Sequence, residues 1–110
     1  MNICQNALEE LARGIVTIIG SQAVRIVLYG SVAKGINDAE SDVDIAVLLR
    51  GTLTPETENR LSEFIVDMNL KYDTVFSVID IDIDMFNRWE NAIPFYKKVN
   101  DEGIVLWKAA

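Results

Sequence analysis

The stretch that guides the interpretation of this chain begins as Gly30-Ser31-Val32-Ala33-Lys34-Gly35 and ends as Ser41-Asp42-Val43-Asp44. It follows residues 24–29, which are rich in β-branched and aromatic side chains and predict a strand. Residues 42–49 carry apolar side chains at every second position, and this alternation predicts a second strand. The sequence therefore predicts a polar loop over residues 30–41, held between two strands.

The composition of this loop suits the binding of phosphate groups. Glycine allows the backbone to turn sharply and to approach a ligand closely, which favours Gly30 and Gly35 as contact points. Backbone N–H groups and the Ser31 hydroxyl can donate to phosphate oxygens. Lys34 adds a positive charge. The predicted nucleotide-binding residues are Gly30, Ser31, Lys34, Gly35 and Ser41.

Two carboxylates, Asp42 and Asp44, stand two residues apart at the start of the second predicted strand. A period of two places both on one face of the strand, with Cα atoms roughly 6.6 Å apart. Paired carboxylates repel each other unless cations lie between them, and such pairs can hold two Mg²⁺ ions. A Gly-Ser turn or an Asp-x-Asp alone is commonly just a turn or a solvated strand edge. Together they predict a site for a nucleoside triphosphate and magnesium.

The remaining chain predicts a mixed α/β (α+β) domain. Apolar residues at helical spacing predict helices over residues 5–19 and 55–70, the latter started by Thr54 and Pro55. Residues 72–81 predict a third strand, residues 83–90 and 94–100 two further helices, and residues 104–107 a short terminal strand. The order α-β-β-α-β-α-α-β implies a small mixed sheet flanked by helices, in one domain over residues 1–110.

Composition excludes several classes of function. The 110 residues carry 10 Lys and Arg against 17 Asp and Glu, a net charge of −7, which argues against electrostatic capture of nucleic acid or anionic membranes. Histidine is absent, which excludes histidine-based catalysis and metal sites, and Cys4 is the single cysteine. The sequence has neither a signal peptide pattern nor an apolar run of membrane-spanning length. We therefore expect a cytoplasmic protein.

Seven positions of the loop and strand form one string: Gly30, Ser31, Ala33, Gly35, Ser41, Asp42 and Asp44. This string resembles the nucleotidyltransferase motif of the DNA polymerase β-like superfamily. The small size resembles the minimal nucleotidyltransferases (MNT), the antitoxins paired with HEPN toxins, and residues 94–96 and 102–104 resemble the tail of such domains. The resemblance implies that Gly30 and Ser31 hold the triphosphate, and that Asp42 and Asp44 carry two Mg²⁺ ions. Val32 departs from the arginine of many relatives.

The resemblance also implies a third acidic residue on the strand after the helix, which completes the metal site and assists deprotonation. Four candidates lie in this stretch: Asp73, Asp80, Asp82 and Asp84. We assign the role to Asp73, at the predicted start of the third strand, on the face that also carries Ser77. Asp80, the second choice, falls on the opposite face. Asp82 and Asp84 suit the cap and first turn of a helix.

The resemblance finally implies an enzyme that transfers AMP from ATP to a hydroxyl on a partner protein. Because a chain of this length leaves no room for a substrate domain, we expect the acceptor on that partner, a tyrosine of a HEPN ribonuclease toxin. Two alternatives stay open. The chain could neutralise its partner by binding alone, or it could be a small-molecule nucleotidyltransferase that needs a second subunit. The oligomeric state is also open.

Overall fold

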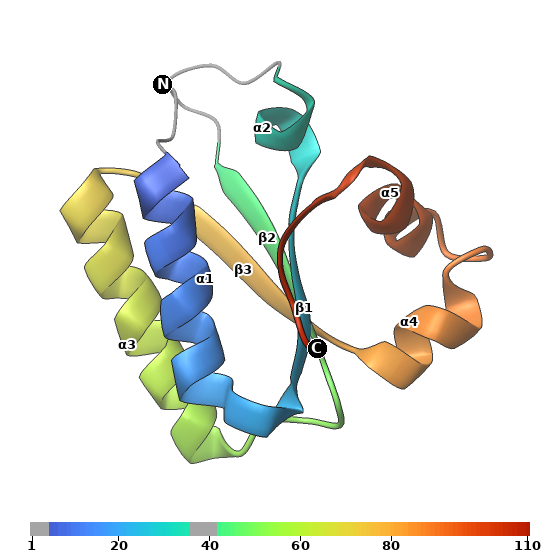
Figure 1. Ribbon diagram of the computed structural model, residues 1–110, viewed down its shortest axis with the longest axis horizontal. Coiled ribbons are helices and arrows are strands. Elements are labelled where there is room, and N and C mark those ends of the chain that lie inside the picture. Colours follow the sequence, from blue (N-terminus) through green and yellow to red (C-terminus); the bar gives the residue numbers. More distant parts are fainter. Residues whose placement is uncertain (1–4, 36–41) are drawn as a thin grey trace.

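The computed structural model describes residues 5–35 and 42–110 of the chain. The elements follow the predicted mixed α/β order, with two added short helices (Figure 1). They are α1 (Gln5–Ile19), the 3-10 helix η1 (Gly20–Gln22), β1 (Ala23–Tyr29), α2 (Gly30–Lys34), β2 (Val43–Leu49), α3 (Pro55–Tyr72), β3 (Phe76–Asp82), α4 (Ile83–Trp89), α5 (Pro94–Glu102) and β4 (Ile104–Lys108).

The strands form one mixed sheet in the order β3-β2-β1-β4. β1 pairs antiparallel with both β2 and β4, while β2 and β3 run parallel and are joined through α3. Parallel neighbours need such a crossover, whereas antiparallel neighbours can be joined by a short connection. β1 and β2, which flank the predicted phosphate loop, therefore lie at the centre of the sheet.

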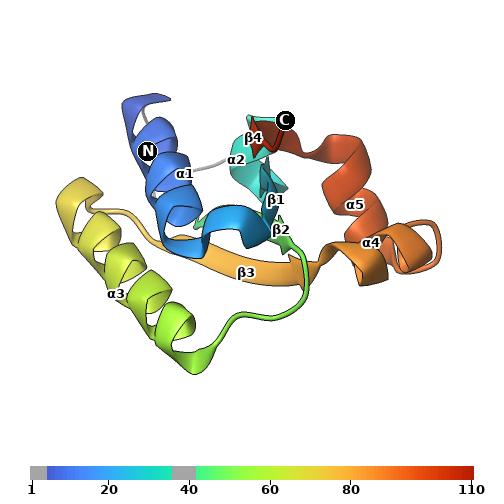
Figure 2. The same ribbon diagram turned by 60° about the horizontal axis from the view of Figure 1, so that its bottom comes forward.

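Each face of the sheet has its own apolar core (Figures 1 and 2). Helices α1 and α3 lie side by side over one face, where β2 contributes Val43, Ile45, Val47 and Leu49, as the alternation predicts. Helices α4 and α5 cover the other face, where Ala46 and Leu48 of β2 meet Phe86 and Val99. Because side chains of a strand alternate between faces, each side chain of β2 points toward one of these two pairs of helices.

Helix α3 ends later than predicted, and the expectation of a strand over residues 72–81 is corrected. The helix continues to Tyr72, whose hydroxyl donates to Glu10 of α1 at 2.6 Å. Asp73 then adopts a left-handed conformation (φ 49°), and its N–H donates to the carbonyl of Asn69. The Asn69 side chain accepts from the N–H of Phe76 at 2.9 Å, where β3 begins. Contacts across the fold thus override the β-forming composition of this segment.

The loop predicted after β1 is also corrected in part. Residues 30–34 form the short helix α2 directly after β1, and Gly35 follows with a φ of +75°. The predicted starts of two other helices are confirmed: Thr54 caps α3 ahead of Pro55, and Asp82 caps α4 by accepting from the N–H of Asp84 at 3.0 Å. Within residues 5–35 and 42–110, no helix is both long and apolar enough to cross a membrane.

Candidate functional site

Asp42 and Asp44 lie at the end of the sheet where β1 ends and β2 begins. Asp42 directly precedes β2, and Asp44 pairs in register with Tyr29, the last residue of β1. Asp44 shares its face with Ala46 and Leu48, which belong to the core beneath α4 and α5. The two carboxylates therefore stand on the α5 side of the sheet, at the mouth of an apolar core.

Gly30 and Asp44 approach each other so closely that no side chain fits between them. Gly30 has a φ of +79°, and a Cβ atom added to it would collide with Oδ2 of Asp44. Glycine is required here for two independent reasons, the left-handed backbone and the space that the carboxylate occupies. The turn that starts the predicted phosphate loop is thus built around the Asp44 carboxylate.

The Asp44 carboxylate is electrostatically unfavourable without a cation. Burial raises the pKa of Asp44 above its ordinary value, the charge of Asp42 raises it further, and Lys98 on α5 lowers it. Burial also raises the pKa of the neighbouring Tyr29 phenol, and Asp44 adds to that effect. Two close carboxylates with oxygen ligands free to bind fit a hard divalent cation such as Mg²⁺.

Helix α5 forms the wall of the site opposite the sheet. The Phe95 ring packs edge-on against Tyr29, with ring centroids 5.4 Å apart, and α5 also contacts α2. Lys98 lies one helical turn beyond Phe95 and acts on Asp44 through its charge. The sequence analysis missed Lys98. A lysine three residues after an aromatic side chain is not a distinctive pattern, and it indicates a site only when the packing of α5 against β1 is known.

The structure places the predicted third carboxylate beside the site and not within it. Asp73 is exposed at the end of α3, three residues before β3. It lies at the same end of the sheet as Asp42, because β2 and β3 are parallel and the N–H of Val43 donates to the carbonyl of Val75. Within the described residues, no three acidic side chains lie close enough to hold one metal ion.

The second choice, Asp80, lies on the other face of the sheet. It alternates with Val78 and Phe76, whose side chains pack on the α1–α3 side, and it contacts Glu58 of α3. The residue that β3 does place next to Asp44 is Ser77, its partner in the parallel register. Ser77 shares the face of Asp44 and offers a hydroxyl there.

The remaining loop residues are described in part. The backbones of Ser31 and Lys34 belong to α2, next to β1 and β2, while the roles predicted for their side chains lie outside what the structure describes. Ser41 lies outside the described residues. A Cβ atom at Gly35 would meet open space, so the second glycine is needed for its left-handed backbone alone.

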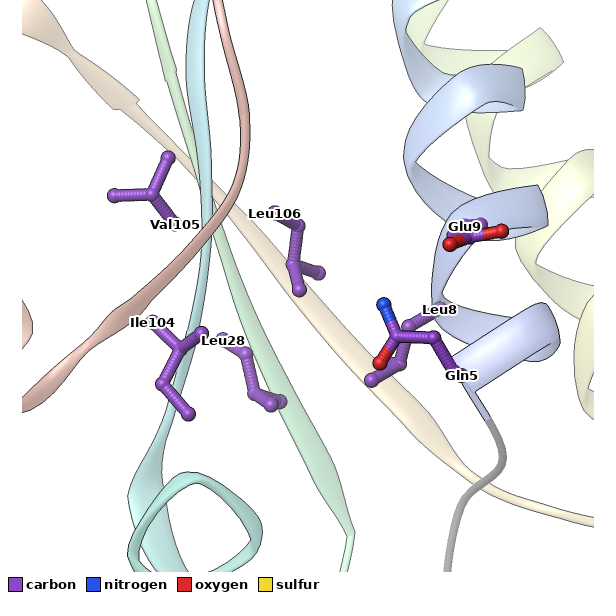
Figure 3. Close-up of a pocket in the computed structure, with 7 residues that line it drawn as sticks. All are labelled: Gln5, Leu8, Glu9, Leu28, Ile104, Val105 and Leu106. Carbon is purple, nitrogen blue, oxygen red and sulfur yellow. The ribbon is translucent and has the colours of Figure 1, made fainter.

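An apolar groove between α1 and β4 lies on the other face of the sheet from Asp44 (Figure 3). Leu28 and Leu106 point from the sheet toward Leu8 and Gln5 of α1, and Glu9 stands at the rim. Leu8 and Leu28 belong to the core beneath α1 and α3, which separates this groove from the carboxylate pair. Its lining of aliphatic side chains does not suit phosphate or metal chemistry.

Comparison with known proteins assigns this chain to a family. The family model described as "Polymerase beta, Nucleotidyltransferase" matches residues 15–110, which contain the whole site. The chain belongs to the polymerase beta nucleotidyltransferase family. A relative from Methanocaldococcus jannaschii, named "Putative protein adenylyltransferase MJ0141", is 33% identical over 72 residues, which cover 66% of this chain and 73% of the relative. The family resemblance of the sequence is confirmed.

Solved structures with this fold are similar to nearly the whole chain. A toxin–antitoxin crystal structure with AMP-PNP superimposes with a TM-score of 0.62 at 22% identity, covering 92% of this chain and 73% of the other. A tri-AMPylated Shewanella oneidensis HEPN toxin in complex with its MNT antitoxin gives a TM-score of 0.58 at 20% identity, with 96% and 74% covered. These likenesses show that the fold is that of a nucleotidyltransferase.

Proposed function

We propose that this nucleotidyltransferase transfers AMP from ATP to a hydroxyl on a partner protein, a tyrosine of a HEPN toxin, and so acts as an antitoxin. One observation carries the proposal: the Asp44 carboxylate occupies the space left by the missing side chain of Gly30, and the Asp42 carboxylate lies close enough to act on it. The names of similar proteins support the class of acceptor: one is a protein adenylyltransferase, and another is an MNT antitoxin in complex with an AMPylated HEPN toxin.

Two groups of residues would bind the nucleotide: the carboxylates through metal ions and the loop residues through the phosphates. Asp42 and Asp44 would hold Mg²⁺, two ions in the proposed site, because their mutual repulsion and oxygen ligands suit hard cations. Mg²⁺ bound there would neutralise charge on the triphosphate and on the departing pyrophosphate. Gly30 and Gly35 bring the backbone close to the phosphates, with Ser31, Lys34 and Ser41 as further predicted contacts.

The proposed reaction exchanges a phosphoanhydride bond of ATP for a phosphoester bond to the acceptor. The acceptor oxygen bonds to the α-phosphorus, the bond from that phosphorus to the bridging oxygen breaks, and pyrophosphate leaves with the bonding electrons. The acceptor's proton passes to a base. Since the chain has no histidine, a carboxylate is the available side chain, and Asp73 lies at the same end of the sheet as Asp42. Positioning of the reactants supplies much of the rate.

Intact mass spectrometry of the partner toxin tests the proposal. The toxin is incubated with this chain, ATP and Mg²⁺, and we expect its mass to rise by one or more AMP units. Asp42→Asn with Asp44→Asn should abolish the increase, because the metal ligands are lost. Asp73→Asn should slow it, whereas Asp80→Asn, on the opposite face, should leave it unchanged and serves as the matched control. A mass increase that survives in the double variant would refute the assigned site.

A second function, neutralisation by binding alone, is favoured by one observation. Within residues 5–35 and 42–110, the site gathers a pair of carboxylates and not three. A stable complex with the toxin, no change in its mass, and equal protection by the double variant would establish this alternative. AMP transfer to a small metabolite without any partner protein would instead indicate a small-molecule nucleotidyltransferase.

A further inference from the structure

Helix α5 is held in one orientation by contacts on three sides. Val99 is 2% exposed and packs with Val27 and Ala46 against the sheet. Tyr96 packs on Phe86 of α4, with ring centroids 5.4 Å apart, and Phe95 packs edge-on against Tyr29 on the opposite flank. The helix can therefore neither rotate nor slide without breaking one of these packing contacts.

The chain after α5 is equally constrained. A Cβ atom at Gly103 would collide with the side chain of Val27 and the carbonyl of Val99. Glycine therefore lets the chain pass directly against β1 as it leaves α5 and enters β4. This close passage and the packing of Val99 make the last turn of α5 a rigid support for any side chain that it carries.

Lys98 lies on the flank of α5 that faces the carboxylate site. It is three residues after Phe95, so both side chains lie on the same side of the helix. This flank points away from α4 and toward α2 and Tyr29, the register partner of Asp44. Lys97, its neighbour, lies about 100° further around the helix and falls on the outer side. The two adjacent lysines thus have different surroundings.

We propose that Lys98 binds the phosphate chain of the nucleotide held at Asp42 and Asp44, an inference that rests on the proposed function. A triphosphate brings several negative charges toward two carboxylates, in a chain whose net charge is −7. Lysine is a compact charge with three donors, and it binds phosphate oxygens without a fixed geometry. Lys98 supplies this charge from the rigid wall opposite the loop.

A different role for Lys98, as a counter-charge for Asp44 alone, makes a different prediction for nucleotide binding. A positive charge on the flank of α5 that faces Tyr29 and its register partner Asp44 repels any cation held at that carboxylate. Its removal should therefore leave the affinity for a divalent cation alone unchanged or higher. If Lys98 binds phosphate, the same removal must lower the affinity for the nucleotide. A lower affinity for the nucleotide, together with an unchanged or higher affinity for the cation, is expected only if Lys98 binds phosphate.

Isothermal titration calorimetry on the full chain tests the inference. Mn²⁺ alone, and AMP-PNP with Mg²⁺, are titrated into the wild type, Lys98→Ala, Lys98→Arg and the matched control Lys97→Ala. We expect Lys98→Ala to weaken AMP-PNP binding roughly 10-fold, as for the loss of a hydrogen bond to a charged group. Mn²⁺ binding should not weaken. Lys98→Arg keeps the charge and should retain most of the affinity, and Lys97→Ala should change it less than about twofold.

The outcomes separate this inference from the proposed function. Unchanged AMP-PNP affinity in Lys98→Ala, in a wild type that binds the nucleotide, would overturn the role of Lys98 alone. Equal weakening of Mn²⁺ and AMP-PNP binding would also overturn it, since that pattern indicates a general disturbance of the site. A wild type that binds Mn²⁺ but no nucleotide would overturn both proposals. Circular dichroism of each variant confirms that the fold is retained.

Discussion

Gly30 shows how a single residue links the backbone to the chemistry of this chain. Its left-handed backbone starts the turn after β1, and its missing side chain leaves the space that the Asp44 carboxylate occupies. Gly35 has the same kind of backbone, with a φ of +75°, but no atom of residues 5–35 or 42–110 lies near its missing Cβ. Substitutions at the two glycines can therefore be compared to distinguish the effect of backbone strain from the effect of displacing the carboxylate.

Gly30→Ala should inactivate the enzyme, while Gly35→Ala should mainly lower its stability. Both alanines would be strained by roughly 1–2 kcal/mol in the left-handed region. Gly30→Ala must in addition displace Asp44, and a misplacement of about 1 Å can reduce the rate roughly 100-fold. Thermal unfolding and AMP transfer, measured on both variants, test this difference. Equal loss of AMP transfer in both would show that the Gly30–Asp44 contact is not needed for catalysis.

At the scale of elements, α3 contacts α1 near one end and β3 near the other. Near its C-terminus, Lys71 and Tyr72 bind Glu10 of α1, and these hydrogen bonds, led by the one from Tyr72, lower the pKa of Glu10. Near its N-terminus, Glu58 lies beside Asp80 of β3, and the charge of Asp80 raises the pKa of Glu58. The first contact holds α3 against α1, whereas the second opposes the packing of α3 on β3.

Asp80→Asn should stabilise the fold at neutral pH. The pKa of Glu58 is higher in the folded chain than in the unfolded one, so this pair opposes folding increasingly as the pH rises through that raised pKa. The substitution removes one charge and provides an amide that can donate to Glu58. Because both groups are exposed, we expect a gain of about 0.5 kcal/mol or less.

Thermal unfolding of the wild type and Asp80→Asn, followed from pH 4 to pH 8, measures this effect. The two curves should converge at low pH, where Glu58 is protonated in both states, and should separate as the pH rises. A constant difference at every pH would mean that the effect of the substitution is not electrostatic.

At the scale of the whole molecule, the sheet separates two cores with different relations to the site. The core beneath α1 and α3 is the larger, and Val32 and Ala33 of α2 pack against it. The smaller core beneath α4 and α5 positions Phe95 and Lys98 opposite the carboxylates. Nucleotide binding should therefore depend more on the second core than on the first.

Val99→Ala and Val47→Ala test this separation, because both valines are buried and they lie on opposite faces of the sheet. Each substitution should lower the free energy of unfolding by about 1–3 kcal/mol, through lost burial and the cavity left behind. Val99→Ala should also weaken AMP-PNP binding, since α5 becomes less firmly held. Urea unfolding and calorimetry supply the two readouts. Similar nucleotide affinities in both variants would show that α5 does not position the site.

The local sequence determined most of the elements and the centre of the site. Alternation in β2 placed Asp42 and Asp44 on one face, and the caps Thr54 and Asp82 marked where α3 and α4 begin. The period of β3 predicted that Ser77 and Asp80 lie on opposite faces, because the period of a strand does not depend on its partners. Such features depend on backbone geometry and on side chains within a few residues, so a sequence pattern can predict them.

The tertiary structure alone decided how these elements meet. Helix α3 extends to Tyr72 because Glu10, 62 residues away, accepts its hydroxyl, and this moved Asp73 out of the predicted strand. The sheet order brought Ser77 beside Asp44, and the packing of Phe95 on Tyr29 brought the helix that carries Lys98 against the register partner of Asp44. Contacts between residues far apart in the chain depend on how the apolar faces pack together, and no local pattern contains that information.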